Sequence, residues 1–158
     1  MTGRAGVPMM ETLLLSVWIG AALLFAAVVA PAAFSILPSR SLAGALVGRV
    51  LPVIFYAGVV IGSLIVILDV LSRTGAWART AAGAVAALAC AVAQLVVGTR
   101  IDRLRAAIGV PLEALANDDP RRAAFGKLHA ISVGWLGIAM LAAIIALTLA
   151  VRASAPRQ

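Results

Sequence analysis

Four long apolar blocks constrain this chain more than any other feature of the sequence. They cover residues 12–34, 50–71, 80–98 and 130–151, and no acidic or basic residue lies in the central part of any block. Each block is close to the roughly 20 residues that cross a hydrocarbon layer of about 30 Å as a helix. The blocks are rich in Ala and Leu and do not alternate in polarity, which disfavours membrane-spanning strands. The sequence therefore predicts an all-α membrane protein with four transmembrane helices in an antiparallel bundle.

The charged residues are too few for a water-soluble domain of this size. Of the 158 residues, 63% are hydrophobic and 12% are charged, whereas soluble domains carry roughly 25% charged residues. The mean hydropathy is +1.10. The net charge of +7 does not indicate nucleic-acid binding, because the 13 basic residues lie almost entirely between the apolar blocks, as expected for charges that flank membrane spans. We expect residues 1–158 to form a single transmembrane domain whose main partner is the lipid bilayer.

The first two connections between the blocks predict different structures. Residues 35–49 contain Pro38 and small residues, which favour a turn followed by a short interfacial helix. Residues 72–80 predict a tight turn at Gly75. Trp77 follows this turn and suits the headgroup layer of the membrane.

The third connection, residues 99–129, predicts more helix than loop. Its first part carries apolar residues at helical spacing, namely Ile101, Leu104 and Ile108. This spacing indicates that the third helix continues beyond the membrane as an amphipathic extension. Its last part offers a helix cap before Pro120 at Asn117, Asp118 or Asp119. The last helix is therefore expected to begin near Pro120 and to enter the bilayer from there.

Counting lysines and arginines by side predicts the orientation in the membrane. The first and third loops carry eight, namely Arg40, Arg49, Arg100, Arg103, Arg105, Arg121, Arg122 and Lys127. The other side carries five, namely Arg4, Arg73, Arg79, Arg152 and Arg157. The positive-inside rule then places the two loops in the cytoplasm and both termini outside, in a multi-pass protein of the plasma (inner) membrane. The first block exceeds the roughly 7–15 apolar residues of a cleavable signal segment, so we interpret it as a span.

Small residues indicate where the helices pack. Gly58 and Gly62 form a GxxxG pair, which lets helix backbones approach closely in lipid, and we assign Gly20 to helix packing as well. Cys90 lies in an apolar run of small residues and is interpreted as a small hydrophobe at a helix contact. These residues favour a compact bundle or a homo-oligomer and do not decide between the two.

Two polar residues within the blocks are interpreted differently: Gln94 belongs to the bundle interior, and Asp69 is an interfacial charge rather than a proton carrier. Gln94 is costly in lipid, so its side chain should face the bundle interior, as helix-packing glue or as part of a ligand path. Asp69 lies near the end of the second block. The spacing predicts that it pairs with Arg73 one helical turn away.

His129, the only histidine, lies where a basic segment meets the fourth block. On a continuous helix it shares a face with Ser132 and Phe125, and its imidazole can be neutral or charged near physiological pH. It is expected to face inward toward the third helix, with a functional role or a structural hydrogen bond as the alternatives. The candidate polar site comprises His129, Ser132, Gln94, Arg100 and Asp102. A complete metal site is not predicted, because one histidine without a cysteine pair or a carboxylate cluster leaves too few ligands.

Several segments give the chain a resemblance to a known family. "WIGAALLFAAVVAPAAFSILP", "AGALVGRVLPVIFYAG", "TRIDRLR" and "FGKLHAISV" resemble the family of small proteins like transmembrane protein 205 (domain of unknown function 4149), over roughly residues 13–150. The more telling positions are Gly20, Pro31, Phe34, Ala43, Gly44, Gly48, Phe125, Leu128, His129 and Ser132. Two positions depart from the expected pattern: Thr99 replaces a proline, and Trp135 or Leu136 replaces a polar residue. The resemblance implies a four-span membrane protein and no particular activity.

Two classes of function remain open on the sequence. In the first, which we favour because ligands for a cofactor are few, the protein is a non-enzymatic membrane component. It is then a small transporter, or an accessory subunit of a membrane partner, and holds no cofactor. In the second, it is a redox protein that handles haem or copper through His129. The sequence shows no nucleophile with an adjacent base, no phosphate-binding glycine loop and no paired carboxylates, so we predict no catalytic residues.

Overall fold

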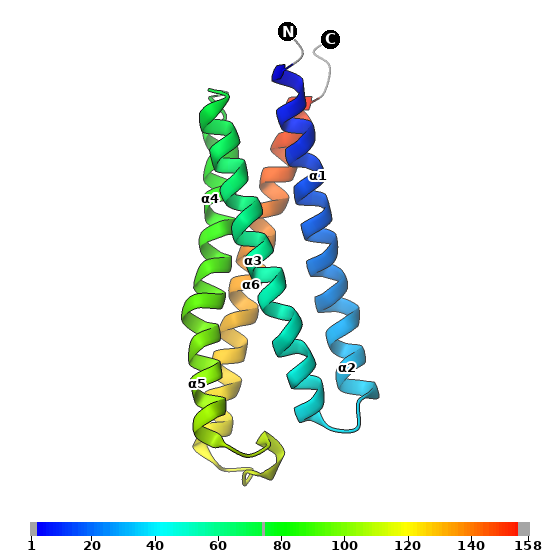
Figure 1. The fold of residues 1–158 in the computed structure, drawn as a ribbon, viewed down its shortest axis with the longest axis vertical. Helices are drawn as coiled ribbons and strands as arrows, with labels where there is room; N and C mark the ends of the chain where they lie inside the picture. The colour runs from blue at the N-terminus through cyan, green and yellow to red at the C-terminus, as the bar shows by residue number, and fades with distance from the viewer. Residues whose placement is uncertain (1–2, 74, 155–158) are drawn as a thin grey trace.

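The computed structural model describes residues 3–73 and 75–154 as a bundle of long helices (Figure 1). Its helical segments, some of which adjoin without a break, are α1 (Gly3–Leu24), η1 (Phe25–Val29), α2 (Ala30–Ile36), α3 (Arg40–Leu71), α4 (Trp77–Ala91), η2 (Val92–Gly98), α5 (Thr99–Ile108), η3 (Leu112–Ala114) and α6 (Pro120–Ser154). Two of them, η1 and η2, are π-helical, and η3 is a 3-10 turn. These two described ranges contain no strand.

Among the residues that the structure describes, four continuous helices are long and apolar enough to cross a membrane. They have 31, 32, 32 and 35 residues and cover Gly6–Ile36, Arg40–Leu71, Trp77–Ile108 and Pro120–Ser154. At 1.5 Å per residue each is roughly 46–53 Å long, which exceeds a hydrocarbon layer of about 30 Å. The predicted class, an all-α membrane protein built as a four-helix bundle, is confirmed.

Successive long helices run in opposite directions, so the connections gather at two ends of the bundle (Figure 1). At one end α1 begins, α6 ends and the chain turns from α3 into α4; we call this the turn end. At the other end lie the α2–α3 connection and residues 109–119, and we call this the two-loop end.

The first connection is shorter than the sequence predicted. We expected a turn and a separate interfacial helix over residues 35–49, but α3 begins at Arg40 and continues unbroken to Leu71. The side chain of Ser39 caps this helix by accepting a hydrogen bond from the backbone N–H of Leu42 at 3.2 Å. No proline interrupts residues 40–51, so the interfacial segment and the span merge into one helix.

Glycines in α3 bring its backbone close to α4 and α1. A Cβ atom added at Gly58 would lie 2.5 Å from the Sγ of Cys90 and 2.8 Å from the ring of Trp18. One added at Gly62 would lie 2.6 Å from the backbone oxygen of Gly83. The space that these glycines leave is therefore occupied by neighbouring helices, as expected where dispersion contacts hold helices together in lipid.

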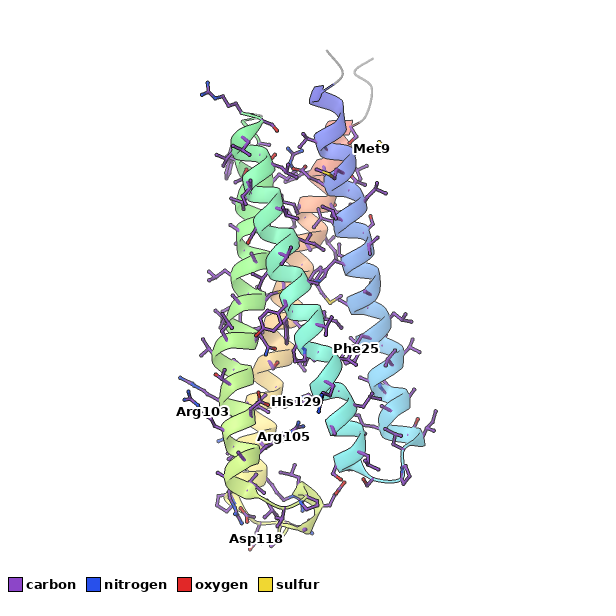
Figure 2. The ribbon with its side chains drawn as sticks, in the orientation of Figure 1. Met9, Phe25, Arg103, Arg105, Asp118 and His129 are labelled. Carbon is purple, nitrogen blue, oxygen red and sulfur yellow. The ribbon has the colours of Figure 1, made fainter. Side chains whose placement is uncertain are left out.

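The outer surface of the bundle is apolar. Large apolar side chains stand exposed on each long helix (Figure 2), for example Val17 (72%), Val53 (66%), Leu88 (63%) and Leu141 (65%). An apolar surface this extensive fits contact with lipid rather than water. Gly20, which we assigned to helix packing, lies on this outer surface, and a Cβ atom there would meet nothing within 4 Å. Within one chain, the helix contact predicted at Gly20 is therefore not made.

Candidate functional site

A cavity of about 520 Å³ opens at the two-loop end of the bundle, between α3, α5 and α6. Its volume lies within the range of roughly 300–1,000 Å³ that is typical of small-molecule sites. Apolar side chains from the bundle core form its floor, namely Val47, Leu51, Phe55 and Ala93. The floor continues the hydrophobic core, so the cavity can take up an apolar group.

Five charged side chains surround the mouth of this cavity, and the positive ones outnumber the negative ones. The residues are Arg40, Arg105, Arg122, Asp102 and Glu113. Two of these side chains hold loops together. Arg122 donates hydrogen bonds to the backbone oxygen of Leu115 at 3.1 Å and to the amide oxygen of Asn117 at 2.8 Å. Glu113 accepts one from the backbone N–H of Ser41 at 2.6 Å.

Arg105 on α5 projects into the cavity mouth with few protein partners. Figure 2 shows its side chain directed toward the bundle, whereas Arg103 on the same helix points outward. Its guanidinium donates one long hydrogen bond, 3.3 Å, to the backbone oxygen of Gly44 and lies 5.2 Å from the ring centroid of Phe125. No salt bridge to Arg105 is found within residues 3–73 and 75–154. Most of its donors are therefore available to a ligand.

Two glycines of α3 provide the space for Arg105. A Cβ atom at Gly48 would lie 2.9 Å from a terminal nitrogen of Arg105, and one at Gly44 would lie 3.3 Å from the other. Larger residues at these positions would displace the guanidinium. Gly44 and Gly48 are among the positions that carry the family resemblance, and the contact with Arg105 gives them a physical role.

His129 lies on the cavity wall beside Phe125. The two rings are parallel within 2°, with centroids 6.4 Å apart, so Arg105, Phe125 and His129 form a row along the mouth. In the described part of the chain His129 forms no hydrogen bond, and its side chain is exposed. Its relation to the third helix is therefore indirect, through the Phe125 ring on which Arg105 rests.

The structure brings four of the five predicted site residues to the same cavity. His129 and Ser132 line it from α6, Gln94 from η2 and Asp102 from α5. Gln94 belongs to a π-helical segment, a feature that often occurs at functional sites. Arg100 is exposed and does not line the cavity. Whether these residues bind a ligand stays a prediction.

Sequence reasoning did not select the three arginines of the cavity mouth. In the sequence, Arg40, Arg105 and Arg122 indicate only the orientation in the membrane. One signal was available for Arg105, because it follows Asp102 by three residues on the same helix and therefore shares its face. For Arg40 and Arg122, which lie far apart in the sequence, no local signal existed.

A second polar cluster lies at the turn end and is buried between helices. Arg79 of α4 forms a salt bridge with Asp69 of α3, with its Nε 3.1 Å from both carboxylate oxygens, and its Nε is also 3.1 Å from an oxygen of Glu11 of α1. The predicted pairing of Asp69 with Arg73 is wrong. Arg73 lies beyond the end of α3 with φ of 46°, so it does not share the helical face of Asp69. The turn into α4 places Arg79 beside Asp69 instead.

The last helix begins at Pro120, where the sequence predicted it. Of the three expected caps, Asp119 accepts a hydrogen bond from the backbone N–H of Arg121 at 2.8 Å. The Asp119 carboxylate also forms a salt bridge with the guanidinium of Arg121 at 2.6 Å. These bonds from Arg121 stabilise the ionised form and lower the pKa of Asp119 to about 2. The start of α6, and with it the approach to His129, is thus held by a charged cap.

The apolar outer surface, the four long helices and the enclosed polar sites together define an integral membrane protein of the four-helix bundle class. The chain belongs to the family Domain of unknown function (DUF4149), which matches residues 13–109. The chain matches none of the curated proteins and none of the solved structures. The matched residues include the floor of the cavity, Gly44, Gly48 and Arg105, and end before α6. The closer likeness to transmembrane protein 205 stays a prediction.

Proposed function

We propose that this membrane protein binds a small anionic amphiphile in the cavity at the two-loop end and acts without catalysis, as a small transporter or as an accessory subunit. The observation that carries the proposal is the guanidinium of Arg105, which is held above an apolar floor with most of its donors unused. A planar guanidinium binds carboxylate or phosphate groups through paired hydrogen bonds, and the floor offers a surface for an acyl chain or a ring.

The distribution of basic residues supports an entry route for this ligand. The two-loop end carries eight lysines and arginines and the opposite side carries five, so the positive-inside rule favours a cytoplasmic two-loop end in the plasma membrane. The ligand would then enter from the cytoplasm or from the inner leaflet, where the cavity mouth meets the headgroups.

The polar groups on α6 support binding rather than catalysis. Ser132 and His129 share a face of this helix, and no hydrogen bond links them in the part of the chain that the structure describes. Ser132 is buried, whereas His129 is exposed. An activated nucleophile requires its base within hydrogen-bond reach.

Thermal unfolding of the purified protein with two detergent-like ligands tests this proposal. Dodecyl phosphate and dodecylphosphocholine share a chain and differ in net charge, so an anion site should respond more strongly to the first. A ligand at 100 times its Kd stabilises by about 2.7 kcal/mol, which is roughly 5–10 °C at about 2–4 °C per kcal/mol. Equal shifts with both ligands would contradict an anion site.

Arg105→Gln and Arg103→Gln provide a matched pair of variants. Both remove one charge from α5, but only Arg105 lines the cavity. A hydrogen bond to a charged group contributes about 1.5–3 kcal/mol, so Arg105→Gln should weaken binding of dodecyl phosphate by about 10- to 100-fold. Arg103→Gln should leave the affinity close to that of the wild type. Equal losses in the two variants would mean that general surface charge, and not the cavity, attracts the ligand.

The transporter and accessory forms of the proposal are distinguished in liposomes. A transporter should carry its anionic ligand across the membrane of proteoliposomes that contain this chain alone. An accessory subunit should bind the ligand there without moving it, and should be recovered from mild detergent with a second membrane protein or as a homo-oligomer. Loss of both activities with Arg105→Gln would link them to the same cavity.

Haem binding is a second candidate, favoured by one observation. The imidazole of His129 faces a partly apolar cavity without a hydrogen-bond partner among the described residues, and arginines at the mouth suit carboxylates. No group of three His, Cys, Asp or Glu residues is found in the described ranges, so copper is less well supported. A Soret band in protein purified from haem-supplied cells, and its loss in His129→Ala, would favour haem over the amphiphile.

A further inference from the structure

Among the side chains that the structure describes, the buried cluster at the turn end holds two carboxylates and one guanidinium. Glu11, Asp69 and Arg79 are each exposed by 3% or less, so water cannot screen their charges. Two ionised carboxylates beside one guanidinium would leave a net charge of −1. An unpaired charge in such surroundings is costly, and it is commonly relieved by neutralisation of the group.

The geometry shows which carboxylate is the less well paired. Arg79 Nε carries a single hydrogen, and this hydrogen is donated to the Asp69 carboxylate. Asp69 also accepts a hydrogen bond from the hydroxyl of Thr80 at 3.1 Å. Glu11 lies close to the same Nε, but within the described residues neither of its oxygens has a hydrogen-bond partner.

We propose that Glu11 is a proton-binding site, occupied near neutral pH, and that the Asp69–Arg79 pair sets its occupancy. This inference is independent of ligand binding in the cavity at the other end. When the pair is intact, Arg79 donates to Asp69 and Glu11 keeps its proton. When the pair opens, Arg79 turns its donor to Glu11, and the proton leaves to water at the turn end.

The groups around Glu11 favour a proton over a metal ion. Its charged neighbours are Asp69 from α3 and Arg79 from α4. From α6, the uncharged Leu149 and Ala153 line a hollow beside Arg79. The nearby Arg152 of α6 is exposed. A metal ion would need several oxygen ligands and would be repelled by the adjacent guanidinium. The hollow, about 210 Å³, lies next to the α3–α4 turn and reaches Arg79, and we assign to it the route by which the proton leaves to water.

Infrared spectroscopy of the purified full chain tests the proposal, since a protonated carboxyl group has its own carbonyl absorption. Near neutral pH the wild type should show this absorption and Glu11→Gln should lack it. Asp118→Asn is the matched control, because Asp118 is exposed in the loop at the opposite end (Figure 2), and it should keep the absorption. Asp69→Asn should lose the absorption, because Arg79 then donates to Glu11.

The pH dependence of thermal unfolding gives an independent measurement with Glu11→Gln, which mimics the protonated group. If the folded wild type keeps a proton that the unfolded chain releases, its stability falls as pH rises above the ordinary range of glutamate. The melting temperature should then fall by several degrees toward alkaline pH in the wild type and change less in Glu11→Gln. Three results would overturn the proposal: no protonated carboxyl in the wild type, an absorption unchanged by Glu11→Gln, or its loss on adding sodium at constant pH.

Discussion

The close backbone contact between α3 and α4 at Gly62 makes a quantitative prediction. In Gly62→Ala the added Cβ atom would lie 2.6 Å from the backbone oxygen of Gly83 and 2.9 Å from the backbone nitrogen and the Cβ of Ala87. None of these three atoms belongs to the end of a flexible side chain. The two helices must therefore move apart, or the new methyl group must remain in a strained contact.

The size of this effect follows from comparison with Gly20→Ala. Both substitutions exchange glycine for alanine inside a helix, which by itself favours the helix by about 1 kcal/mol. At Gly20 a Cβ atom meets nothing within 4 Å, so this variant shows the helix effect alone. Overpacking typically costs about 1–3 kcal/mol. Gly62→Ala should therefore melt roughly 2–12 °C below Gly20→Ala, at about 2–4 °C per kcal/mol.

Thermal unfolding in one detergent, followed by circular dichroism, measures both variants against the wild type. A melting temperature of Gly62→Ala equal to that of Gly20→Ala would refute the reasoning, because it would mean that α3 and α4 do not meet at this glycine. A loss in Gly20→Ala as large as that in Gly62→Ala would instead indicate that the outer face of α1 packs against another chain.

Three further predictions concern single contacts. Gly48→Leu should displace the guanidinium of Arg105 and weaken dodecyl phosphate binding about as much as Arg105→Gln, as measured by thermal shift, whereas unchanged binding would show that this glycine does not position the arginine. Trp18→Phe removes a buried indole N–H bond of 2.9 Å to a backbone oxygen and should cost about 0.5–1.5 kcal/mol in unfolding assays; an unchanged melting temperature would contradict it. Arg121 lowers the pKa of Asp119 to about 2. The ionised Asp119 carboxylate therefore contributes its full stabilisation of the folded protein above about pH 4, and this contribution is lost as pH falls toward 2. The melting-temperature difference between the wild type and Asp119→Asn should shrink over that range, and a constant difference would contradict it.

The number and kind of helices could be predicted from the sequence because they depend on local properties. A run of about 20 apolar residues without charge has few stable arrangements in lipid other than a helix that satisfies its own backbone hydrogen bonds. The same reasoning located the start of α6, since Asp119 and Pro120 form a cap and a first turn whatever the helix packs against. It was less accurate for residues 35–49, where the sequence did not show whether the interfacial helix ends before the span.

The shared position of His129 and Ser132 on the cavity wall was also foreseeable, because helical spacing alone puts them on one face, although only Ser132 is buried. The sequence did not show which partner each charged group has. Arg100, Arg103 and Arg105 lie within six residues of one another on α5, yet only Arg105 lines the cavity. This choice depends on how α5 is rotated in the bundle, and α5 packs against α6, which follows it only after the loop of residues 109–119.

The buried cluster of Glu11, Asp69 and Arg79 also separates what the sequence predicts from what the tertiary structure decides. From the sequence, Asp69 had a suitable partner one turn away in Arg73, and Glu11 had no evident role. The α3–α4 turn reverses the chain and brings Arg79 beside Asp69, while packing of α1 brings Glu11 to the same guanidinium. Local spacing determined which residues could form helices, but the pairing of charges required the positions of three helices in space. Electrostatic energy depends on distance and burial, which the order of residues along the chain does not contain.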